Sequence, residues 1–231
     1  MLKILRWAKR VFLVLIGVFL LYQGWLFGWV VYWKNHNPEM TRFMQIRLND
    51  MRAQNPQSQL KKQWVDYAKV SVYLKRALIS SEDDLFMQHD GFDWDGIQKA
   101  IERNQQKGRI VAGGSTISQQ LAKNLFLSPA KTPWRKAEET LITLMIEHTW
   151  SKQRIFEVYL NVIEWGNGVF GAEAAARHYF GVSAAKLSPA QAAKLAAMTP
   201  NPRFYDKNRN TPALARKTEI ILNRMQASQV P

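Results

Sequence analysis

Hydrophobic residues are distributed unevenly along the chain, and the first 33 positions hold its longest uncharged stretch. Four basic residues lie within the first ten positions, and residues 11–33 then carry no charged side chain. A hydrocarbon core about 30 Å thick needs about 20 helical residues, so this run is long enough for a transmembrane helix. Basic residues favour the cytoplasmic end of a span, which predicts a cytoplasmic tail at residues 1–10 and an extracytoplasmic chain after Lys34.

The next segment, residues 34–69, is polar and basic with scattered apolar side chains. This pattern predicts a linker that leads into a partly amphipathic helix close to the membrane. Contact with lipid headgroups is one interpretation of Lys61 and Lys62, and solvated lysines are the simpler one.

From residue 70 onwards the apolar residues recur with a helical period. Val70, Tyr73, Leu74, Ala77 and Leu78 form one stripe, which predicts a buried helix. No sustained alternation of polar and apolar residues predicts a strand, so the part after the span is predicted to be mostly α. A glycine-rich turn is expected at residues 166–168. Start and end signals for further helices follow in chain order: Asp95 and Gly108, Thr116 with Gln119, Thr132-Pro133, Ser151, Gly171 and Gly181, Ser188-Pro189 with Pro200 and Pro202, and Thr211-Pro212.

The composition narrows the class of protein. The chain has 231 residues, no cysteine, and 32 Lys and Arg against 18 Asp and Glu, for a formal net charge of +14. A chain of this size buries one good-sized core with room for a small extra lobe. The charge predicts an anionic partner: nucleic acid, a lipid surface or a phosphorylated substrate. The absence of cysteine excludes disulfides, thiolate nucleophiles and cysteine-based metal sites.

The segment from Ser80 to Asp93 concentrates acidic residues in this basic chain. Glu82 directly follows the predicted buried helix and is expected to lie half in the core. Partial burial raises the pKa of a carboxyl group, which suits a general acid or base. A solvated acidic turn is the alternative interpretation of the same cluster.

Two later segments are rich in polar side chains. Residues 113–124 begin with two glycines, which allow close approach of a ligand to the backbone, and run into a helix N-terminus that suits an anion. Within them Gln120, Lys123 and Asn124 share one helical face. Arg135 and Glu139 are four residues apart on a helix, where an ordinary ion pair worth about 0.3–0.5 kcal/mol is the simpler explanation.

Together these segments resemble the motifs of one family, the peptidoglycan glycosyltransferases that polymerise lipid II. Residues 82–91 are similar to its E-D-x-x-F-x-x-H-x-G motif, and residues 113–124 to G-G-S-T-I-[ST]-Q-Q-x-x-K-N. Residues 135–139, 155–161 and 174–180 resemble R-K-x-x-E, I-x-E-x-Y-L-N and A-A-x-x-Y-F. The motifs keep the family's order over roughly residues 70–205, and the short anchored chain resembles the monofunctional members.

The resemblance implies roles by position. Glu82 would be the general base for the acceptor sugar's 4-hydroxyl in an inverting transfer, and Glu139 the second catalytic carboxylate. Glu139 would order cationic groups or a divalent cation, Mg²⁺ or Mn²⁺, near the pyrophosphate; no organic cofactor is expected. Residues 157, 159 and 161 are expected to serve mainly the structure. The implied substrate-binding residues are Asp83, Phe86, His89, Gly114, Ser115, Thr116, Gln119, Gln120, Lys123, Asn124, Lys131 and Arg135.

The resemblance also implies an architecture and partners. We expect a mostly α, lysozyme-like glycosyltransferase domain at residues 70–231, a small membrane-proximal jaw at residues 34–69, and a transmembrane helix at residues 11–33. The expected location is the plasma or inner membrane, with the catalytic domain on its outer side. Expected partners are lipid II, the nascent glycan, membrane lipids and cell-division or elongation proteins, with no nucleic acid.

Three alternatives are weighed against this hypothesis. Two S-x-x-K strings, at residues 128–131 and 183–186, lack the S-D-N and K-T-G partners of a penicillin-binding transpeptidase. A lytic, lysozyme-like enzyme would share the fold but would not need the cationic segment between Gly113 and Arg135. A non-catalytic membrane scaffold would not need the complete polar motifs.

Overall fold

The computed structural model describes residues 2–109 and 113–231. The chain forms two compact units, residues 1–37 and residues 38–231. The first unit consists of α1 (Leu2–Asn35). Within the described residues, Ile4–Asn35 is long and apolar enough to cross a membrane, with a hydropathy of 2.1. This helix confirms the apolar helix predicted from the sequence, and it continues through the polar residues on both sides of the uncharged run.

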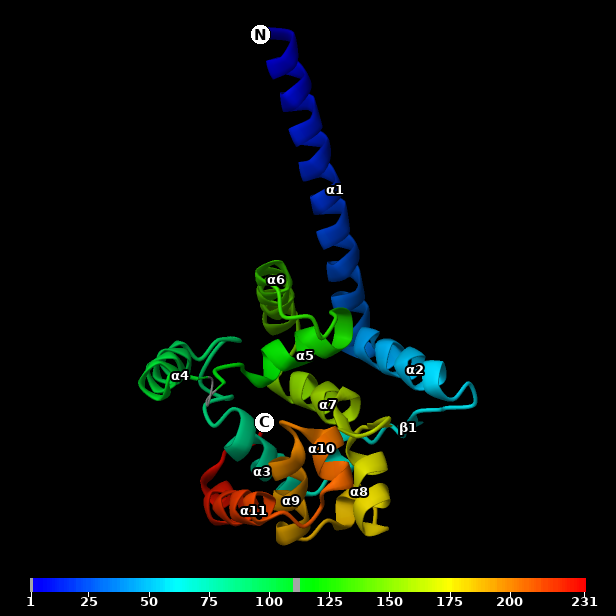
Figure 1. Cartoon of the computed structure of the whole chain (residues 1–231), viewed down its shortest axis with the longest axis vertical. Helices are drawn as coiled ribbons and strands as arrows, with labels where there is room; N and C mark the ends of the chain where they lie inside the picture. The colour runs from blue at the N-terminus through cyan, green and yellow to red at the C-terminus, as the bar shows by residue number, and fades with distance from the viewer. Residues whose placement is uncertain (1, 110–112) are drawn as a thin grey trace. The chain divides into compact units, whose positions relative to one another are not determined.

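The second unit is mostly helical, as predicted (Figure 1). Its elements in chain order are α2 (Arg42–Gln54), β1 (Lys61–Lys62), α3 (Val72–Glu82), α4 (Trp94–Lys107), α5 (Ile117–Phe126), α6 (Pro133–Thr149), α7 (Lys152–Val162), β2 (Glu164–Gly166), β3 (Val169–Phe170), α8 (Ala172–Phe180), α9 (Pro189–Met198), α10 (Pro202–Lys207) and α11 (Pro212–Arg224), with short 3₁₀ turns at Tyr67–Lys69, Ala184–Lys186 and Met225–Ala227.

Two helical groups make up the core of this unit. α3 packs against α9 and α11, while α5 packs against α2, α6 and α7 (Figure 1). The apolar stripe predicted from residue 70 becomes the buried face of α3, where Leu74, Ala77 and Leu78 are fully buried. Glu82 is the last residue of that helix. The helix that bears the buried apolar stripe therefore places the Glu82 carboxyl group at its C-terminal end.

Most of the predicted helix boundaries are confirmed by capping contacts. Thr116 and Gln119 form a capping box at the start of α5, and Ser188 begins α9 in the same way. Thr132 caps α6 with Pro133 behind it. Because these signals depend on a few adjacent residues, they are readable without knowledge of the tertiary fold.

Two boundary predictions are wrong. The N-cap of α4 is Asp93, whose Oδ1 accepts a hydrogen bond from the backbone N–H of Gly96 at 2.8 Å; Asp95 lies within the first turn. Pro202 does not end a helix but occupies the first turn of α10, where a missing N–H costs nothing.

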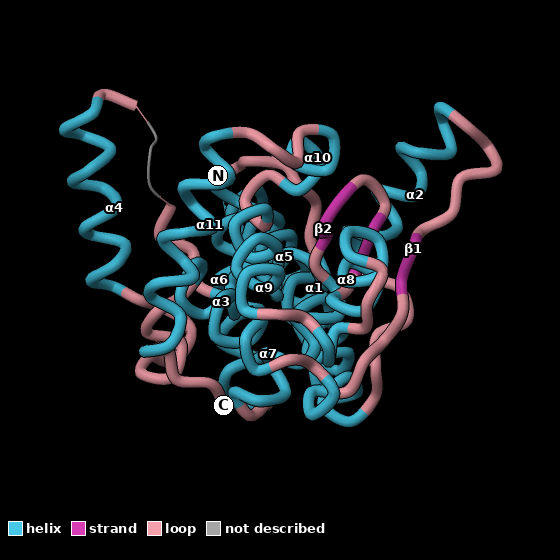
Figure 2. The backbone as a smooth tube through the Cα atoms, turned by 90° about the horizontal axis from the view of Figure 1, so that it is seen from below, coloured by secondary structure: helices cyan, strands magenta, loops and turns pink. Residues whose placement is uncertain are grey.

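A small sheet was also missed. Its strand order is β1-β3-β2, with β1 parallel and β2 antiparallel to β3. Figure 2 shows these strands beside α8, away from the helical centre. The strands hold two or three residues each, too few for a period of two to be recognised. Lys61 and Lys62 belong to β1. The predicted turn at residues 166–168 is present, and Gly168 adopts a positive φ of 72° in it.

Candidate active site

Glu82 lies at the end of a buried helix with one oxygen partnered and one open. Its Oε2 accepts a hydrogen bond from Gln120 Nε2 at 3.0 Å. Its Oε1 is buried and has no hydrogen-bond partner within the described residues. A carboxylate oxygen accepts hydrogen bonds, and a buried one is normally paired. Within the described residues the protein thus fixes one oxygen and leaves the acceptor capacity of the other unused.

Gln120 is itself held by a buried tyrosine. Tyr159, from α7, donates its hydroxyl hydrogen to Gln120 Oε1 at 3.0 Å. Because the hydroxyl occupies the amide oxygen, the amide NH₂ group is directed at Glu82. Burial raises the pKa of Tyr159 well above its ordinary value, so the phenol remains a donor. Its contact with the site was missed, since nothing in the helical spacing places α7 against α5.

Burial is also the main reason why the pKa of Glu82 is raised above its ordinary value. The hydrogen bond from Gln120 and the positive charges of Lys217 and Lys123 act in the opposite direction without cancelling it. A raised pKa makes the ionised carboxylate a stronger proton acceptor, as a general base requires. Lys217 lies on α11, more than 130 positions along the chain, and no motif pointed to it.

Asp83 connects the acidic segment to the start of α5. Its Oδ2 accepts from the backbone N–H of Ile117 at 2.8 Å, and its Oδ1 lies 2.8 Å from His89 Nε2. The backbone N–H of Gly91 points at His89 Nδ1 at 3.2 Å, so Nε2 carries the hydrogen donated to Asp83. Phe86 is fully buried beneath this loop. In this arrangement Phe86 and His89 support the loop, whereas Asp83 both supports the loop and lines a cavity.

Gly114, Ser115 and Thr116 line a cavity of about 190 Å³ together with Glu82 and Asp83. A side chain at Gly114 would bring a Cβ within 2.9 Å of the Ile97 Cα, so only glycine allows the loop to lie this close to α4. Thr116 Oγ1 donates to the carbonyl of Gly91 at 2.7 Å. Gln119 Oε1 accepts from the backbone N–H of Thr116 at 3.1 Å. Thr116 and Gln119 therefore stabilise the loop through these hydrogen bonds. Ser115 lines the cavity.

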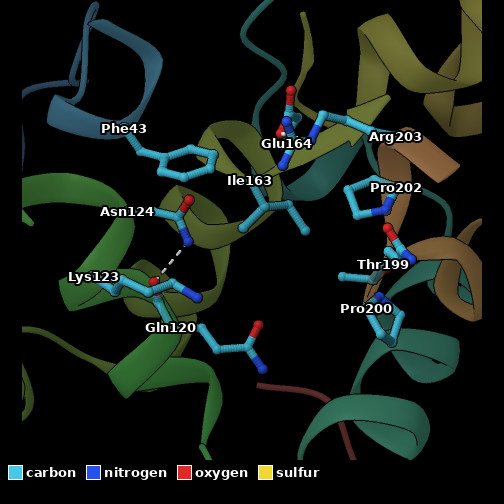
Figure 3. A pocket seen from close by; sticks show the side chains of 11 residues that line it. Phe43, Gln120, Lys123, Asn124, Ile163, Glu164, Thr199, Pro200, Pro202 and Arg203 are labelled. Atoms are coloured by element: carbon cyan, nitrogen blue, oxygen red, sulfur yellow. Dashed lines mark hydrogen bonds and ion pairs between the residues drawn. The ribbon is translucent and has the colours of Figure 1, made fainter. Parts of the chain in front are cut away.

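A second cavity, of about 220 Å³, is lined by Gln120 (Figure 3). Lys123 and Asn124 line one wall from α5, and residues 199–203 line the opposite wall, with Phe43 above. Asn124 Nδ2 donates to the carbonyl of Gln120 at 2.7 Å. The predicted shared face of Gln120, Lys123 and Asn124 is thus present, and it lines this second cavity. The wall from residue 199 to residue 203 was not foreseen.

Cationic side chains gather around Glu139 on α6. Arg135 and Lys136 each donate to a different oxygen of its buried carboxylate. The pKa of Lys123 is lowered, mainly by burial. The charge of Glu139 raises this pKa and the charge of Arg135 lowers it, so Lys123 interacts electrostatically with the charged side chains around Glu139. Lys131 is exposed on the segment between α5 and α6. Lys136, Lys217 and Arg203 lie at the site but were not among the predicted site residues.

Glu139 does not fit a metal ligand in this arrangement. Both of its oxygens already accept hydrogen bonds from cationic side chains. Across the described ranges no group of three or more His, Cys, Asp or Glu side chains is placed to share an ion. Hard cations such as Mg²⁺ prefer carboxylate oxygens, and Glu139 offers none that is unshared.

Comparison with known proteins fits this geometry. Residues 49–226 match the family model described as Transglycosylase. The biosynthetic peptidoglycan transglycosylase of Dechloromonas aromatica is 65% identical over 226 residues, which cover 98% of each chain. The protein of the same name from Laribacter hongkongensis is 61% identical over 98% of this chain and 100% of its own length, and that from Nitrosospira multiformis 58% over 98% of each. The chain belongs to the transglycosylase family.

Proposed function

We propose that this chain is a peptidoglycan glycosyltransferase that elongates glycan strands from lipid II. One observation carries the proposal: Glu82 lines one cavity and has a buried, unpartnered Oε1 within the described residues, while its Oε2 is bonded to Gln120, which lines the second cavity together with Lys123. Transfer from a pyrophosphate-linked donor to a hydroxyl needs a base at one place and positive charge at another. The site provides both.

The reaction then follows as a single displacement. The unpartnered oxygen of Glu82 takes the proton of the acceptor's 4-hydroxyl. At the same time the oxygen of that hydroxyl attacks the anomeric carbon of the donor. The bond from this carbon to the pyrophosphate oxygen breaks on the opposite face, so the configuration inverts and a β-1,4 link forms. The electron pair leaves with the undecaprenyl pyrophosphate, whose charge Lys123 and Arg135 neutralise.

Gln120 and Tyr159 orient the base in this scheme. The fixed amide holds one carboxylate oxygen, so the other is presented to the acceptor without rearrangement during the reaction. Glu139, the second carboxylate, keeps Arg135 and Lys136 directed at the site. Ser115 and Asn124 supply hydrogen bonds to sugar and phosphate groups.

The apolar N-terminal helix supports a location in the plasma or inner membrane. The basic tail would remain in the cytoplasm and residues 38–231 would work on the outer side, where the lipid-linked substrate is exposed. Division or elongation proteins are proposed partners in the same membrane. A divalent cation would have to arrive with the pyrophosphate; polymerisation in the presence and absence of a chelator tests this, and we expect activity to persist because side chains supply the positive charge.

A lytic enzyme is the second candidate, since a single buried glutamate also cleaves glycans. The cation group around Glu139 favours synthesis, because hydrolysis of an uncharged glycosidic bond does not require it. The test is to incubate the purified full chain in detergent with lipid II and, separately, with finished glycan. We expect polymer from lipid II and no digestion of glycan. Digestion of glycan without polymer formation would refute the proposal.

A further inference from the structure

A cavity of about 460 Å³ lies between the extended segment that follows β1 and the region around α8. α8 packs against β1 in this part of the fold (Figure 1). The cavity shares no lining residue with the cavity of Glu82 or with that of Lys123. We call it the lateral cavity, and it is lined by Gln63, Trp64, Val65, Asp66, Lys69, Glu173, Ser183 and Ala185.

The charged side chains of the lateral cavity are already paired. Asp66 Oδ2 accepts a hydrogen bond from Lys69 Nζ at 2.8 Å. Glu173 is 5% exposed, and its two oxygens accept from Arg177 Nε and from the backbone N–H of Ala184, each at 2.7 Å. Because each of these charges has a partner within the protein, the lining favours a neutral ligand over a charged one.

The neutral polar side chains of the lateral cavity are unpaired within the described residues. Trp64 Nε1 is buried and has no hydrogen-bond partner there, although buried N–H groups normally have one. The Gln63 amide and the Ser183 hydroxyl likewise make no hydrogen bond in the described part of the chain. The guanidinium carbon of Arg154 lies 5.7 Å from the centre of the Trp64 ring and helps to hold the indole in place. The cavity therefore offers three unused hydrogen-bonding groups, one of them on a held ring.

These groups match an N-acetylated sugar better than a peptide. An acetamido carbonyl accepts from an indole N–H, and sugar hydroxyls donate and accept as the groups of Gln63 and Ser183 require. A volume of about 460 Å³ lies within the usual range for a small-molecule site. An extended peptide could add to the edge strand β1, but its recognition needs pockets for alternate side chains. The apolar lining of the lateral cavity consists of Val65 and Ala185 alone, which provides no such pocket.

We propose that the lateral cavity binds an N-acetylated disaccharide of a finished glycan strand. Trp64 Nε1 donates to an acetamido carbonyl, and Gln63 and Ser183 bond to hydroxyl groups. A strand bound there does not react, because no residue of the lateral cavity lines the cavity of Glu82. The site thus holds glycan that is neither donor nor acceptor. The inference takes from the proposed function only that glycan is present, and its test does not depend on polymerisation.

The indole N–H signal of Trp64 reports binding at this site directly. The full chain in detergent, isotope-labelled at the indole nitrogens of its nine tryptophans, is titrated with N,N′-diacetylchitobiose and followed by NMR. The Trp64→Phe variant identifies the Trp64 signal by its loss. We expect this signal to move saturably with diacetylchitobiose, since the N–H gains an acceptor. Cellobiose, a neutral disaccharide without acetamido groups, should move it far less.

Two variants test the hydrogen bonds to the sugar. The double variant Gln63→Ala, Ser183→Ala should bind diacetylchitobiose about tenfold more weakly, because hydrogen bonds to the ligand are lost. The matched control is Gln106→Ala, which removes an exposed amide on α4 and should retain the wild-type affinity. A Trp64 signal that does not move with diacetylchitobiose would overturn the inference, and so would equal affinity in the double variant and the control.

Two further titrations distinguish the source of the ligand. Movement of the Trp64 signal with acetyl-trialanine amide but not with diacetylchitobiose would overturn the inference in favour of a peptide. The Glu82→Gln chain, which should not polymerise, is titrated with lipid II and separately with a lipid-free glycan fragment of two disaccharide units. Movement with the lipid-free fragment supports binding of finished glycan. Movement with lipid II alone would overturn it.

Discussion

Replacing Tyr159 with phenylalanine removes a single hydroxyl from the buried chain that reaches Glu82. The substitution leaves the ring packing of α7 unchanged but deprives Gln120 Oε1 of the donor 3.0 Å away. One net hydrogen bond is worth about 1 kcal/mol, and an unpaired buried amide oxygen costs about 1–3 kcal/mol. Gln120 will therefore rotate to find another donor, and Glu82 Oε2 will lose the amide hydrogen at 3.0 Å.

The expected result is a lower turnover and a pH–activity profile whose rising, acidic side moves to higher pH. If the misorientation of Glu82 raises the activation free energy by about 1.4 kcal/mol, turnover falls about tenfold. The hydrogen bond from Gln120 lowers the pKa of Glu82, so its loss raises that pKa further, and the rise of activity with pH moves to higher pH. The measurement is the initial rate of lipid II polymerisation from pH 4 to pH 9 (about one unit per point), with melting followed by circular dichroism.

A control variant is available in the same fold. Tyr73→Phe removes a hydroxyl from α3 outside the Tyr159–Gln120–Glu82 chain, and it should match the wild type in rate and in pH profile. An acid limb at the wild-type position, with an unchanged rate in Tyr159→Phe, would refute the reasoning about orientation.

Three further predictions concern other parts of the site. Glu82→Gln should raise the melting temperature at neutral pH and lose this advantage towards pH 4.5. The pKa of Glu82 is raised from 4.5 in the folded chain, so above that pH the folded chain binds more protons than the unfolded chain and is destabilised as the pH rises. Equal melting temperatures of the variant and the wild type at every pH would contradict the burial of the Glu82 carboxylate. Lys123→Met should lower turnover by about 10²–10³ with an unaltered fold, because one preorganised charge near the leaving group is removed; Lys194→Met, on α9, is the matched control in the same rate assay. Gly114→Ala should impair activity, since the new Cβ would lie 2.9 Å from the Ile97 Cα; an alanine variant with wild-type rates would show that the loop can move away.

The contacts that sequence could predict are those made by neighbours along the chain. The capping box of Thr116 and Gln119 and the apolar stripe that ends at Glu82 are both present because each depends on one helix alone. The shared face of Gln120, Lys123 and Asn124 on α5 follows from helical geometry in the same way. Motif resemblance added the roles of these residues.

The parts that sequence could not predict depend on distant segments. Tyr159 reaches Gln120 only because α7 packs against α5, and Lys217 reaches Glu82 only because α11 packs against α3. The strand pair around Gly168 is too short to show a pattern, and its partner at Lys61 lies about a hundred positions earlier. Such pairings are set by packing of the whole core, which local propensity does not encode.

The central claim is that Glu82 removes the proton from the attacking hydroxyl. The most direct measurement is the initial rate of β-1,4 link formation from lipid II by Glu82→Gln, compared with Glu219→Gln, an exposed glutamate on α11. Loss of a general base should lower the rate by about 10²–10⁴ in Glu82→Gln, while Glu219→Gln should match the wild type. A Glu82→Gln enzyme that forms polymer at the wild-type rate would contradict the account.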